Sequence, residues 1–373
     1  MALTVQQIGS FDAPGLRAAW ARLSDIAPCA SLFSTYEWCR GWADVFGGGS
    51  EVAVSLIHDE RGLPRGLLPA YVDRTGPVRW LKLLGRERVS GDHLDLLCAP
   101  GDHAACLEAL WRHWERSAAF DGLILGELHR DSPTLHAVRF GARQRGWPVQ
   151  EREPQIVPYA DLPATFDAYL DRLSANMRYH VRRRRRGVEK TPGAAVRVAR
   201  TPADIDAALT DLFELHQRRW QRNGRPGNLH DAHKREFLRR FCRTAAERDW
   251  VRAIVIEREG ARQGVLLAFH WRDVASFYQM GWDPDTCIQS PGVVLLAESI
   301  AQAVREGLTR YDFLRGDEPY KRKWTTQAVE QVTLVVGCRT RARAAIAAGR
   351  LKERVKQTLG PAPWQKLKGL LRV

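Results

Sequence analysis

The sequence lacks the features that mark several special protein classes. Its seven cysteines among 373 residues are odd in number and scattered, without a C-x-x-C pair, which argues against a disulfide framework and against a zinc knuckle. No metal-ligand spacing is present, so no metal is expected. No apolar run approaches the ~18 residues of a membrane-spanning helix, and the N-terminus has no signal-peptide pattern. A cytoplasmic location is therefore expected.

Four catalytic motifs are also missing. The sequence contains no G-x-G-x-x-G after a strand pattern, no G-x-x-x-x-G-K-[ST], no G-x-S-x-G and no H-E-x-x-H. These absences argue against dinucleotide oxidoreductases, P-loop NTPases, α/β-hydrolases and zincin proteases.

Positive charge is concentrated in two segments. Residues 182–190 and 339–373 together carry an excess of basic over acidic residues equal to the whole net charge of +14. Such runs indicate either an anionic partner, such as tRNA, a glycan, a cofactor phosphate or an acidic membrane, or simply a solvated face. Within the tail, residues 361–373 form a short basic amphipathic pattern that suits a membrane interface or docking on the protein itself.

Two similar hairpin patterns indicate an internal duplication. Residues 54–71 and 253–269 each read as a strand, an acidic-Arg-Gly turn and a strand, and each is followed by a strand, a helix and a strand. Chance similarity between generic hairpins is the alternative. We therefore predict a mixed α/β fold of two related units, over residues 1–160 and 161–338, followed by a basic helical tail over 339–373.

Several individual elements are predicted around these hairpins. Periodicity and end signals predict helices at 202–222 and 232–247. Apolar β-rich runs predict strands at 93–98, 251–257 and 265–271, with a turn at Glu259-Gly260.

The densest group of reactive side chains lies at residues 311–325, YDFLRGDEPYKRKWT. This segment starts as a strand and breaks at Gly316, and strand ends in α/β sheets are where ligands bind. Its acids, bases and aromatics could supply a proton acceptor, a proton donor and a charge clamp. The alternative is a salt-bridged polar loop.

Two further groups point to a binding pocket. In Gln289-Ser290-Pro291-Gly292, Ser290 suits a helix N-cap and Pro291 the first helical position, and the free N–H groups there can bind a phosphate. His216 and Trp220 are four residues apart on one predicted helix and share a face. They could line a pocket or belong to the core.

Taken together, these motifs resemble a known family. H-Q-x-R-W at 216–220, Y-x-x-G-x-D-P at 278–284, S-P-G at 290–292 and D-F-L-R-G-D-E-x-Y-K-x-x-W at 312–324 look like the GNAT-type acetyltransferases of the CelD/BcsL group, associated with cellulose and exopolysaccharide biosynthesis. That group is similar in fold to the Fem-type aminoacyl-tRNA-dependent peptidoglycan ligases, which carry two tandem GNAT units. The resemblance therefore implies two tandem GNAT-like units.

The resemblance also implies an activity and roles for particular residues. It implies acyl transfer from acetyl-CoA to an amine or hydroxyl of a sugar, a polysaccharide precursor or a cell-envelope acceptor, although the usual Gln/Arg-x-x-Gly-x-Gly/Ala signature for CoA is absent. Lys321 would steady charge on the acyl oxygen, Asp317 or Glu318 would be the base and Tyr320 the acid. The expected cofactor contacts are Gln289, Ser290, Pro291, Gly292 and Arg178, and the expected substrate contacts are His216, Trp220, Asp312, Tyr278 and Trp324.

Two other functions remain open at this point. An aminoacyl-tRNA-dependent ligase would use the arginine run on tRNA phosphates. A non-catalytic partner in polysaccharide assembly, or at a membrane surface, would keep the fold without turnover. The tail at 339–373 predicts peripheral contact with the anionic inner face of the membrane.

Overall fold

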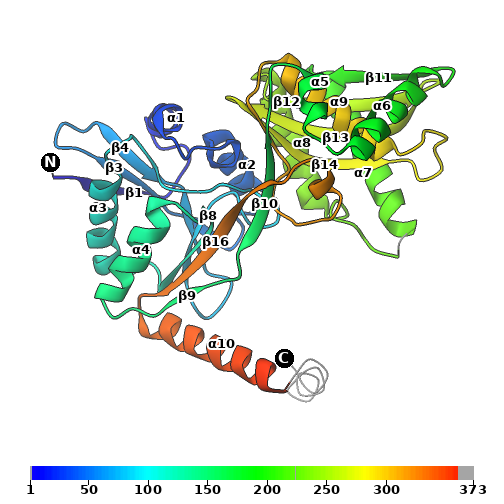
Figure 1. Cartoon of the computed structure of the whole chain (residues 1–373). Helices are drawn as coiled ribbons and strands as arrows, with labels where there is room; N and C mark the ends of the chain where they lie inside the picture. Colours follow the sequence, from blue (N-terminus) through cyan, green and yellow to red (C-terminus); the bar gives the residue numbers. More distant parts are fainter. Residues whose placement is uncertain (1, 223, 360–373) are drawn as a thin grey trace.

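Each half of the molecule repeats the same order of elements (Figure 1). The computed structural model describes residues 2–222 and 224–359. In both halves a strand and two helices precede three consecutive antiparallel stretches, a helix and a further strand. In the first half these are β1 (Thr4–Ile8), α1 (Leu16–Ile26), α2 (Tyr36–Phe46), β3 (Val54–His58), β4 (Pro64–Leu68) continued by β5 (Ala70–Asp73), β6 (Trp80–Leu83), α3 (His103–Arg116) and β8 (Gly122–His129). In the second half they are β11 (Ala194–Ala199), α7 (Pro202–Arg222), α8 (Ala232–Glu247), β12 (Val251–Arg258), β13 (Ala261–Trp271), β14 (Val274–Trp282), α9 (Pro291–Arg305) and β15 (Arg310–Asp312).

The remaining elements connect or extend the two halves. They are β2 (Ser50–Val52), β7 (Leu97–Cys98), α4 (Pro133–Gln144), β9 (Val149–Glu151), β10 (Gln155–Asp161), α5 (Phe166–Asp171), α6 (Ala175–Glu189), β16 (Gln327–Gly337), α10 (Thr340–Leu359) and single 3-10 turns at Leu32–Ser34 and Lys321–Lys323. The repeated order confirms the predicted mixed α/β fold of two related units.

The two halves exchange one strand each. The long sheet has the order β11-β12-β13-β14-β15-β10-β16-β8-β6-β5-β2, while β1, β3, β4 and β7 form a separate sheet. β10 comes from the connecting segment and pairs with β15, whereas β16 comes from the end of the second half and pairs with β8. Figure 1 shows β10 and β16 side by side where the halves meet. Because of this strand exchange, a strand of one unit completes the sheet of the other.

Local sequence signals explain most of the second half. α7 and α8 have the predicted limits, and the side chain of Asp231 accepts a hydrogen bond from the backbone N–H of His233 at the start of α8. Glu259 and Gly260 both have positive φ, as a tight hairpin turn with the right-handed twist requires. The strands predicted at 251–257 and 265–271 are present within β12 and β13.

One predicted strand is wrong. Of residues 93–98, only Leu97–Cys98 form a strand. Asp92 just before this segment and Asp95 within it are buried. Asp92 accepts a hydrogen bond from the backbone N–H of Arg315, and Asp95 accepts one from the Ser132 hydroxyl. Burial of these carboxylates is tolerated because each has a partner, and those partners fix an irregular path.

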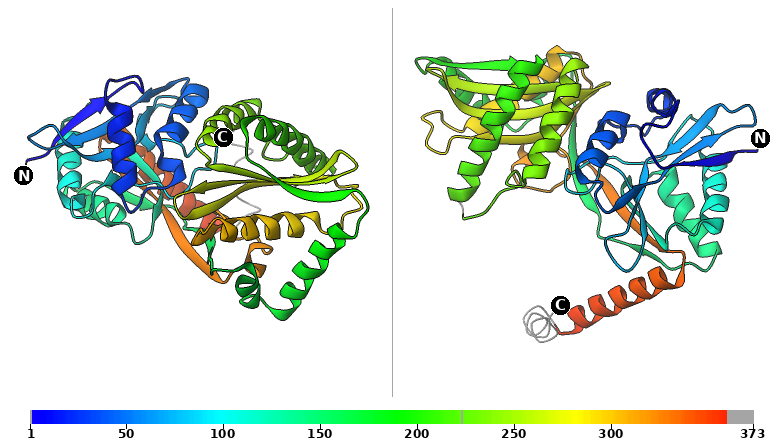
Figure 2. Two further views of the ribbon diagram at one scale, coloured as in Figure 1. Left: turned by 90° about the horizontal axis from the view of Figure 1, so that it is seen from above. Right: turned by 180° about the vertical axis from the view of Figure 1, so that it is seen from behind.

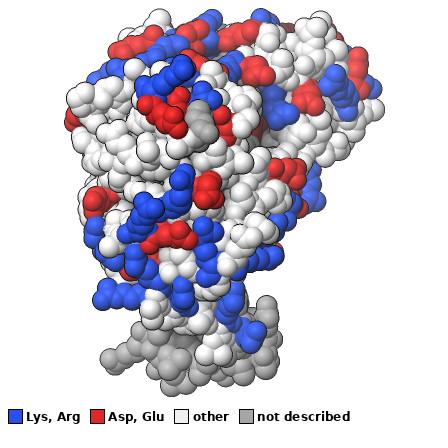
Figure 3. All heavy atoms as spheres, turned by 90° about the vertical axis from the view of Figure 1, so that its left-hand side faces the viewer, with Lys and Arg blue, Asp and Glu red and all other residues white. Residues whose placement is uncertain are grey.

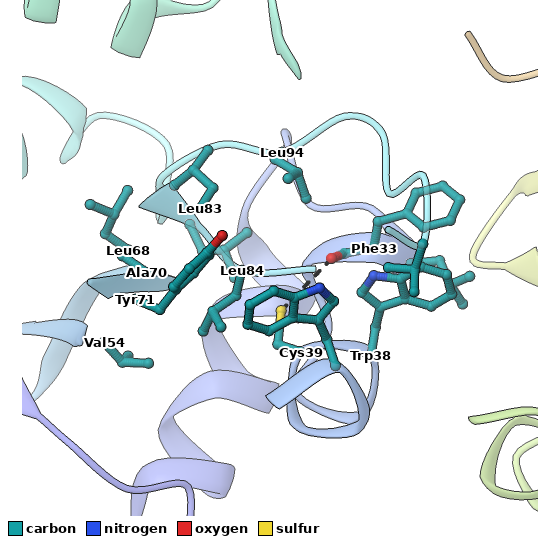
Figure 4. Packing of buried hydrophobic residues seen from close by; sticks show 14 of the residues in the cluster. Phe33, Trp38, Cys39, Val54, Leu68, Ala70, Tyr71, Leu83, Leu84 and Leu94 are labelled. Carbon is teal, nitrogen blue, oxygen red and sulfur yellow. Dashed lines mark hydrogen bonds between the residues drawn. The ribbon is translucent and has the colours of Figure 1, made fainter. Parts of the chain in front are cut away.

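A continuous hydrophobic core joins the halves. Trp38 on α2 is fully buried and lies edge-on to Phe237 and Phe241 of α8, with ring centroids 4.8 Å apart in both cases. Figure 4 shows the first-half side of this core, where side chains of α2, β3 to β6 and residues 84–94 converge. Truncating a buried indole of this kind costs about 3–5 kcal/mol. The first half is therefore firmly docked on α8.

Helices cover both faces of the second-half sheet (Figure 2). α5, α6 and α9 pack on one face, and α7 and α8 pack on the other. Gly281 of β14 permits the close approach of α7, because a Cβ there would lie 2.6 Å from the backbone nitrogen of His216. These two faces become the two sides of the site described below.

The basic tail begins as a helix that leaves the body. Ala342 and Ile346 of α10 are buried, whereas Leu351 is 64% exposed as the helix projects away (Figure 1). Figure 3 shows Lys and Arg side chains, with acidic side chains among them, on the lower part of the face above α10 as well as on its upper part. The amphipathic segment predicted at 361–373 lies outside the described residues. Within residues 2–222 and 224–359, no helix is both long and apolar enough to cross a membrane.

Candidate active site

A gap between two parallel strands creates a large cavity. β14 and β15 pair only through Val274–Ser276 and Arg310–Asp312, after which β15 ends and β14 continues to Trp282. The ladder with β13 skips Tyr278, a bulge that bends β14 at the same point. A cavity of about 1490 Å³ lies here, and residues on both faces of the sheet line it. A ligand that occupies it can therefore be reached from either face.

One end of the cavity, which we call the donor end, is formed by the start of α9. Ser290, Pro291 and Gly292 all line the cavity. Ser290 occupies the N-cap position of α9, as predicted, but its φ is +54° and its side chain makes no cap hydrogen bond. A left-handed backbone disfavours Ser because its Cβ crowds the chain. Pro291 has no N–H, and Gly292 adds no side chain, so the backbone and positive dipole end of this 15-residue helix face the cavity.

A second, basic groove adjoins the donor end. It has a volume of about 750 Å³ and lies between α6 and residues 287–289, with Arg182, Arg183, Arg184 and Arg186 along it. Gln289 and Arg178, predicted as cofactor contacts, line this groove and not the main cavity. Arg184 donates a hydrogen bond to the Gln289 side chain, which ties α6 to the residue next to Ser290. The basic groove thus extends the donor end over the surface.

Lys321 lies on the wall of the same cavity as Ser290, as the sequence predicted. Its side chain is buried, and Nζ donates to the backbone oxygens of Leu314, Arg315 and Gly316 at 3.0, 2.9 and 3.3 Å. Nζ also lies 2.9 Å from Glu318 Oε2. The ammonium donors are thereby already used on the loop that follows β15. Lys321 consequently holds this loop in place, which is a different task from the predicted contact with an acyl oxygen.

The two predicted acids of this loop occupy different environments. Glu318 lines the cavity, whereas Asp317 pairs with Arg322 and does not. The hydrogen bond from Arg322 lowers the pKa of Asp317. Tyr320 lines the cavity beside Glu318, and burial together with the Glu318 charge raises its pKa, so the phenol is protonated at neutral pH. Trp324 also lines the cavity, and its backbone oxygen accepts from Tyr169 at 2.7 Å.

The other end of the cavity, which we call the acceptor end, lies beneath α7 and α8. His216, Trp220 and Tyr278 line it as predicted. Burial lowers the pKa of His216 to about 4, which leaves a neutral imidazole, and its Nδ1 has no hydrogen-bond partner in the described part of the chain. The Tyr278 hydroxyl donates to the backbone oxygen of Val89 at 2.7 Å. This bond ties the bulge of β14 to the first half of the molecule.

Sequence reasoning missed two charged residues at the acceptor end. Lys234 of α8 and Asp92 of the first half both line the cavity, with only 3% and 0% of their surfaces exposed. Burial lowers the pKa of Lys234 to about 8 and raises that of Asp92 to about 6. One signal for Lys234 was present, since a basic residue in the first turn of a helix opposes the helix dipole.

Asp312, predicted to contact substrate, does not line the cavity. Its carboxylate lies 2.7 Å from His93 Nε2 and accepts a hydrogen bond from the Leu314 backbone at 2.7 Å. His93 Nδ1 in turn lies 3.1 Å from the Gln331 amide of β16. Asp312 therefore positions the loop that carries Glu318 and Lys321, by way of the first half.

Comparison with known proteins identifies the domain in the second half of the chain. Residues 175–322 match the family described as "Acetyltransferase (GNAT) domain". The chain has a GNAT fold. The segment matched contains both ends of the cavity, and the predicted fold class of two tandem GNAT-like units is confirmed. No curated protein matches the sequence.

Three solved structures share the fold of nearly the whole chain. FemX is 10% identical, with 88% of this chain and 96% of FemX covered at a TM-score of 0.63. The C-terminal domain of a putative lysylphosphatidylglycerol synthetase from Agrobacterium fabrum is 11% identical, with 91% and 95% covered at 0.53. L-PGS from Bacillus licheniformis is 12% identical, with 88% and 93% covered at 0.52. At these identities the likeness concerns the fold alone.

Proposed function

We propose that this protein transfers an acyl group from an acyl-CoA, with acetyl-CoA as the expected donor, to an amine or hydroxyl. The acceptor we propose is a sugar, a polysaccharide precursor or a cell-envelope molecule, as in the CelD/BcsL group that the motifs resemble. The observation that carries the proposal is a single cavity reached from both faces of the sheet, with an anion-accepting helix start at one end and a polar pocket at the other. This arrangement suits a donor and an acceptor that meet at the gap between β14 and β15.

The residues at the donor end fit a phosphate-bearing thioester. The start of α9 offers backbone N–H groups and the positive end of its dipole to a pyrophosphate. The basic groove beside it offers Arg182, Arg183 and Arg186 to further phosphates. Both features lie on the face covered by α6 and α9, so we place the donor on that face.

Glu318 and Tyr320 supply the proton chemistry. As the acceptor nitrogen or oxygen bonds to the acyl carbon, Glu318 takes the proton that the nucleophile loses. As the carbon–sulfur bond breaks, Tyr320 returns a proton to the departing thiolate. Lys321 fixes the loop on which both residues stand, and a base held in place in this way typically contributes 10²–10⁴-fold to the rate, as an order-of-magnitude range.

An aminoacyl-tRNA donor is the second candidate, and the arginine run of α6 favours it. Arg183 and Arg186 line the basic groove at the surface and do not line the main cavity, as contact with a nucleic-acid backbone would require. Peripheral contact of residues 339–373 with an anionic membrane remains part of either proposal, supported by the basic side chains on the described part of α10.

A transfer assay tests the proposed function. The full chain is incubated with radiolabelled acetyl-CoA and a panel of amino sugars and glycans, and thiol release and label in the product are measured. We expect acceptor-dependent thiol release that is lost in a Glu318→Gln variant. Release only with charged tRNA would favour the second candidate, and no release with either donor would contradict both.

A further inference from the structure

A buried lysine at the acceptor end has no partner in the described part of the chain. Lys234 is 3% exposed and lines the cavity, yet its ammonium has no hydrogen bond or ion pair there. Lys321 is equally buried but is saturated by three backbone oxygens and Glu318. A buried cation without an ion pair lowers the stability of a protein. Such a cation is therefore expected where a bound anionic ligand supplies the missing partner.

The surroundings of Lys234 increase that cost. It lies in the first turn of α8, where the helix dipole disfavours a positive charge. Arg315 lies near enough to lower its pKa further. Of the carboxylates nearby, Asp231 is bonded to Arg88 at 2.6 Å and Asp92 pairs with Arg315 at 3.1 Å. The charge of Asp231 partly offsets the effect of burial on the pKa of Lys234, but neither carboxylate forms an ion pair with the ammonium.

The neighbouring histidine also has a ring nitrogen without a hydrogen-bond partner in the described residues. His216 lines the same end of the cavity, is 1% exposed, and its Nδ1 lacks a partner in the described residues. Lys234 is close enough to contribute to the lowered pKa of His216. A neutral imidazole can donate one N–H, and an ammonium can donate three. Together they offer several donors and a positive charge to one group.

We propose that Lys234 and His216 form an anion-binding subsite that holds a carboxylate or phosphate carried by the acyl acceptor. That the bound anion belongs to the acyl acceptor rests on the proposed function. If it does, the acceptor is a molecule that bears an oxyanion close to the reacting amine or hydroxyl. The subsite lies on the α7 and α8 face, opposite the donor end, so it serves the acceptor and not the phosphates of the donor.

Competitive labelling of the full chain tests the subsite without any acyl donor. Trace acetic anhydride acetylates only neutral amines, and the label on each lysine is measured by peptide mass spectrometry. Phosphate, acetate and chloride buffers of equal ionic strength are compared. A bound anion stabilises the ammonium, and each unit of pKa increase lowers labelling of Lys234 about tenfold. Lys82, already paired with Asp73 and Glu87, is the internal control and should not change.

The outcomes separate the ligand sources and can refute the subsite. Protection by phosphate alone indicates a phosphate-bearing acceptor, protection by acetate alone a carboxylate, and protection by both the shared oxyanion chemistry. Equal labelling of Lys234 in all three buffers overturns the proposal. An absence of Lys234 labelling in chloride overturns it as well. Because no donor is present, these results stand apart from the transfer assay of the proposed function.

A variant gives a second and opposite readout. Lys234→Met removes an unpaired buried charge, so we expect its melting temperature in chloride to equal or exceed that of the wild type. The same variant should lose part of the increase in melting temperature that phosphate or acetate gives the wild type. A merely structural lysine would instead give a lower melting temperature in chloride and an unchanged response to anions, which would overturn the proposal.

Discussion

His93 Nε2 lies 2.7 Å from Asp312 Oδ2, across 219 residues of sequence. This pair links the irregular segment before β7 to the end of β15, and so links the first half of the molecule to the loop that carries Glu318 and Lys321. Positioning of the candidate active site therefore depends on contacts between the two units as well as on the GNAT domain that contains it.

Removing the histidine should destabilise the protein in a pH-dependent way. Burial disfavours the imidazolium of His93, but the charge and hydrogen bond of Asp312 outweigh this and raise its pKa. The pair's contribution is then full below the ordinary histidine pKa of about 6.5 and is lost as the pH rises through the raised value. We expect His93→Gln to lower the free energy of unfolding by about 1–3 kcal/mol at pH 6, and by less at pH 9.

Urea unfolding of both proteins across this pH range checks the prediction. His233→Gln is the control, because the His233 side chain is 65% exposed. A difference between wild type and His93→Gln that stays constant with pH would show that the pair is not charged as described.

Replacing Lys321 should lower the stability of the protein, and the loss of transfer activity should follow from that. Lys321→Met leaves the backbone oxygens of Leu314, Arg315 and Gly316 without their buried donor. A loss of about 3 kcal/mol in the free energy of unfolding is expected, with a loss of transfer activity that follows from the disordered loop. Calorimetric unfolding measures the first effect. An unchanged melting temperature with abolished activity would instead assign Lys321 a direct role at the acyl oxygen.

The two neighbouring acids provide a matched pair. Glu318 lines the cavity, whereas Asp317, which pairs with Arg322, does not. Glu318→Gln should lower kcat by about 10²–10⁴-fold, and Asp317→Asn should leave kcat within a few-fold of the wild type. The ion pair of Glu318 with Lys321 is 53% exposed at the glutamate, so little stability should be lost in the first variant. Steady-state kinetics of both variants decide between the acids, and the reverse pattern would make Asp317 the base.

Replacing Ser290 with glycine should preserve or increase the stability of the protein and weaken ligand binding. Its φ of +54° is a backbone conformation that glycine adopts without strain. Ser290→Gly should therefore keep or raise the free energy of unfolding, by up to about 1 kcal/mol, while weakening CoA binding about tenfold or more through loss of the hydroxyl. Glu259→Gly is the control, since Glu259 has φ +52° in a surface turn and does not line the cavity. Equal CoA affinity in both variants would remove Ser290 from the donor end.

Local patterns in the sequence predicted much of the second half. The limits of α7 and α8 follow from helical periodicity and end residues, and the turn at Glu259-Gly260 follows from its preference for positive φ. The placing of Lys321 and Ser290 on one cavity also follows. Ser290 comes after the end of β14 and Lys321 after the end of β15, and the carboxyl ends of neighbouring parallel strands meet at one edge of a sheet.

The features that were missed depend on contacts that are distant in sequence. The exchange of β10 and β16 could not be predicted, because the strand patterns alone do not specify the partner. His93 and Asp92 read as part of an ordinary strand, since their partners lie more than two hundred residues away. Lys234 reads as an exposed charge at a helix start until the cavity beside it is known.

The most direct test of the account is calorimetric titration of the full chain with acetyl-CoA and, separately, with an aminoacyl-tRNA. We predict saturable binding of acetyl-CoA that is weakened in Ser290→Gly, because this variant removes the Ser290 hydroxyl from the donor end. Absence of acetyl-CoA binding, together with salt-sensitive binding of the charged tRNA, would contradict the assignment of acyl-CoA as the donor.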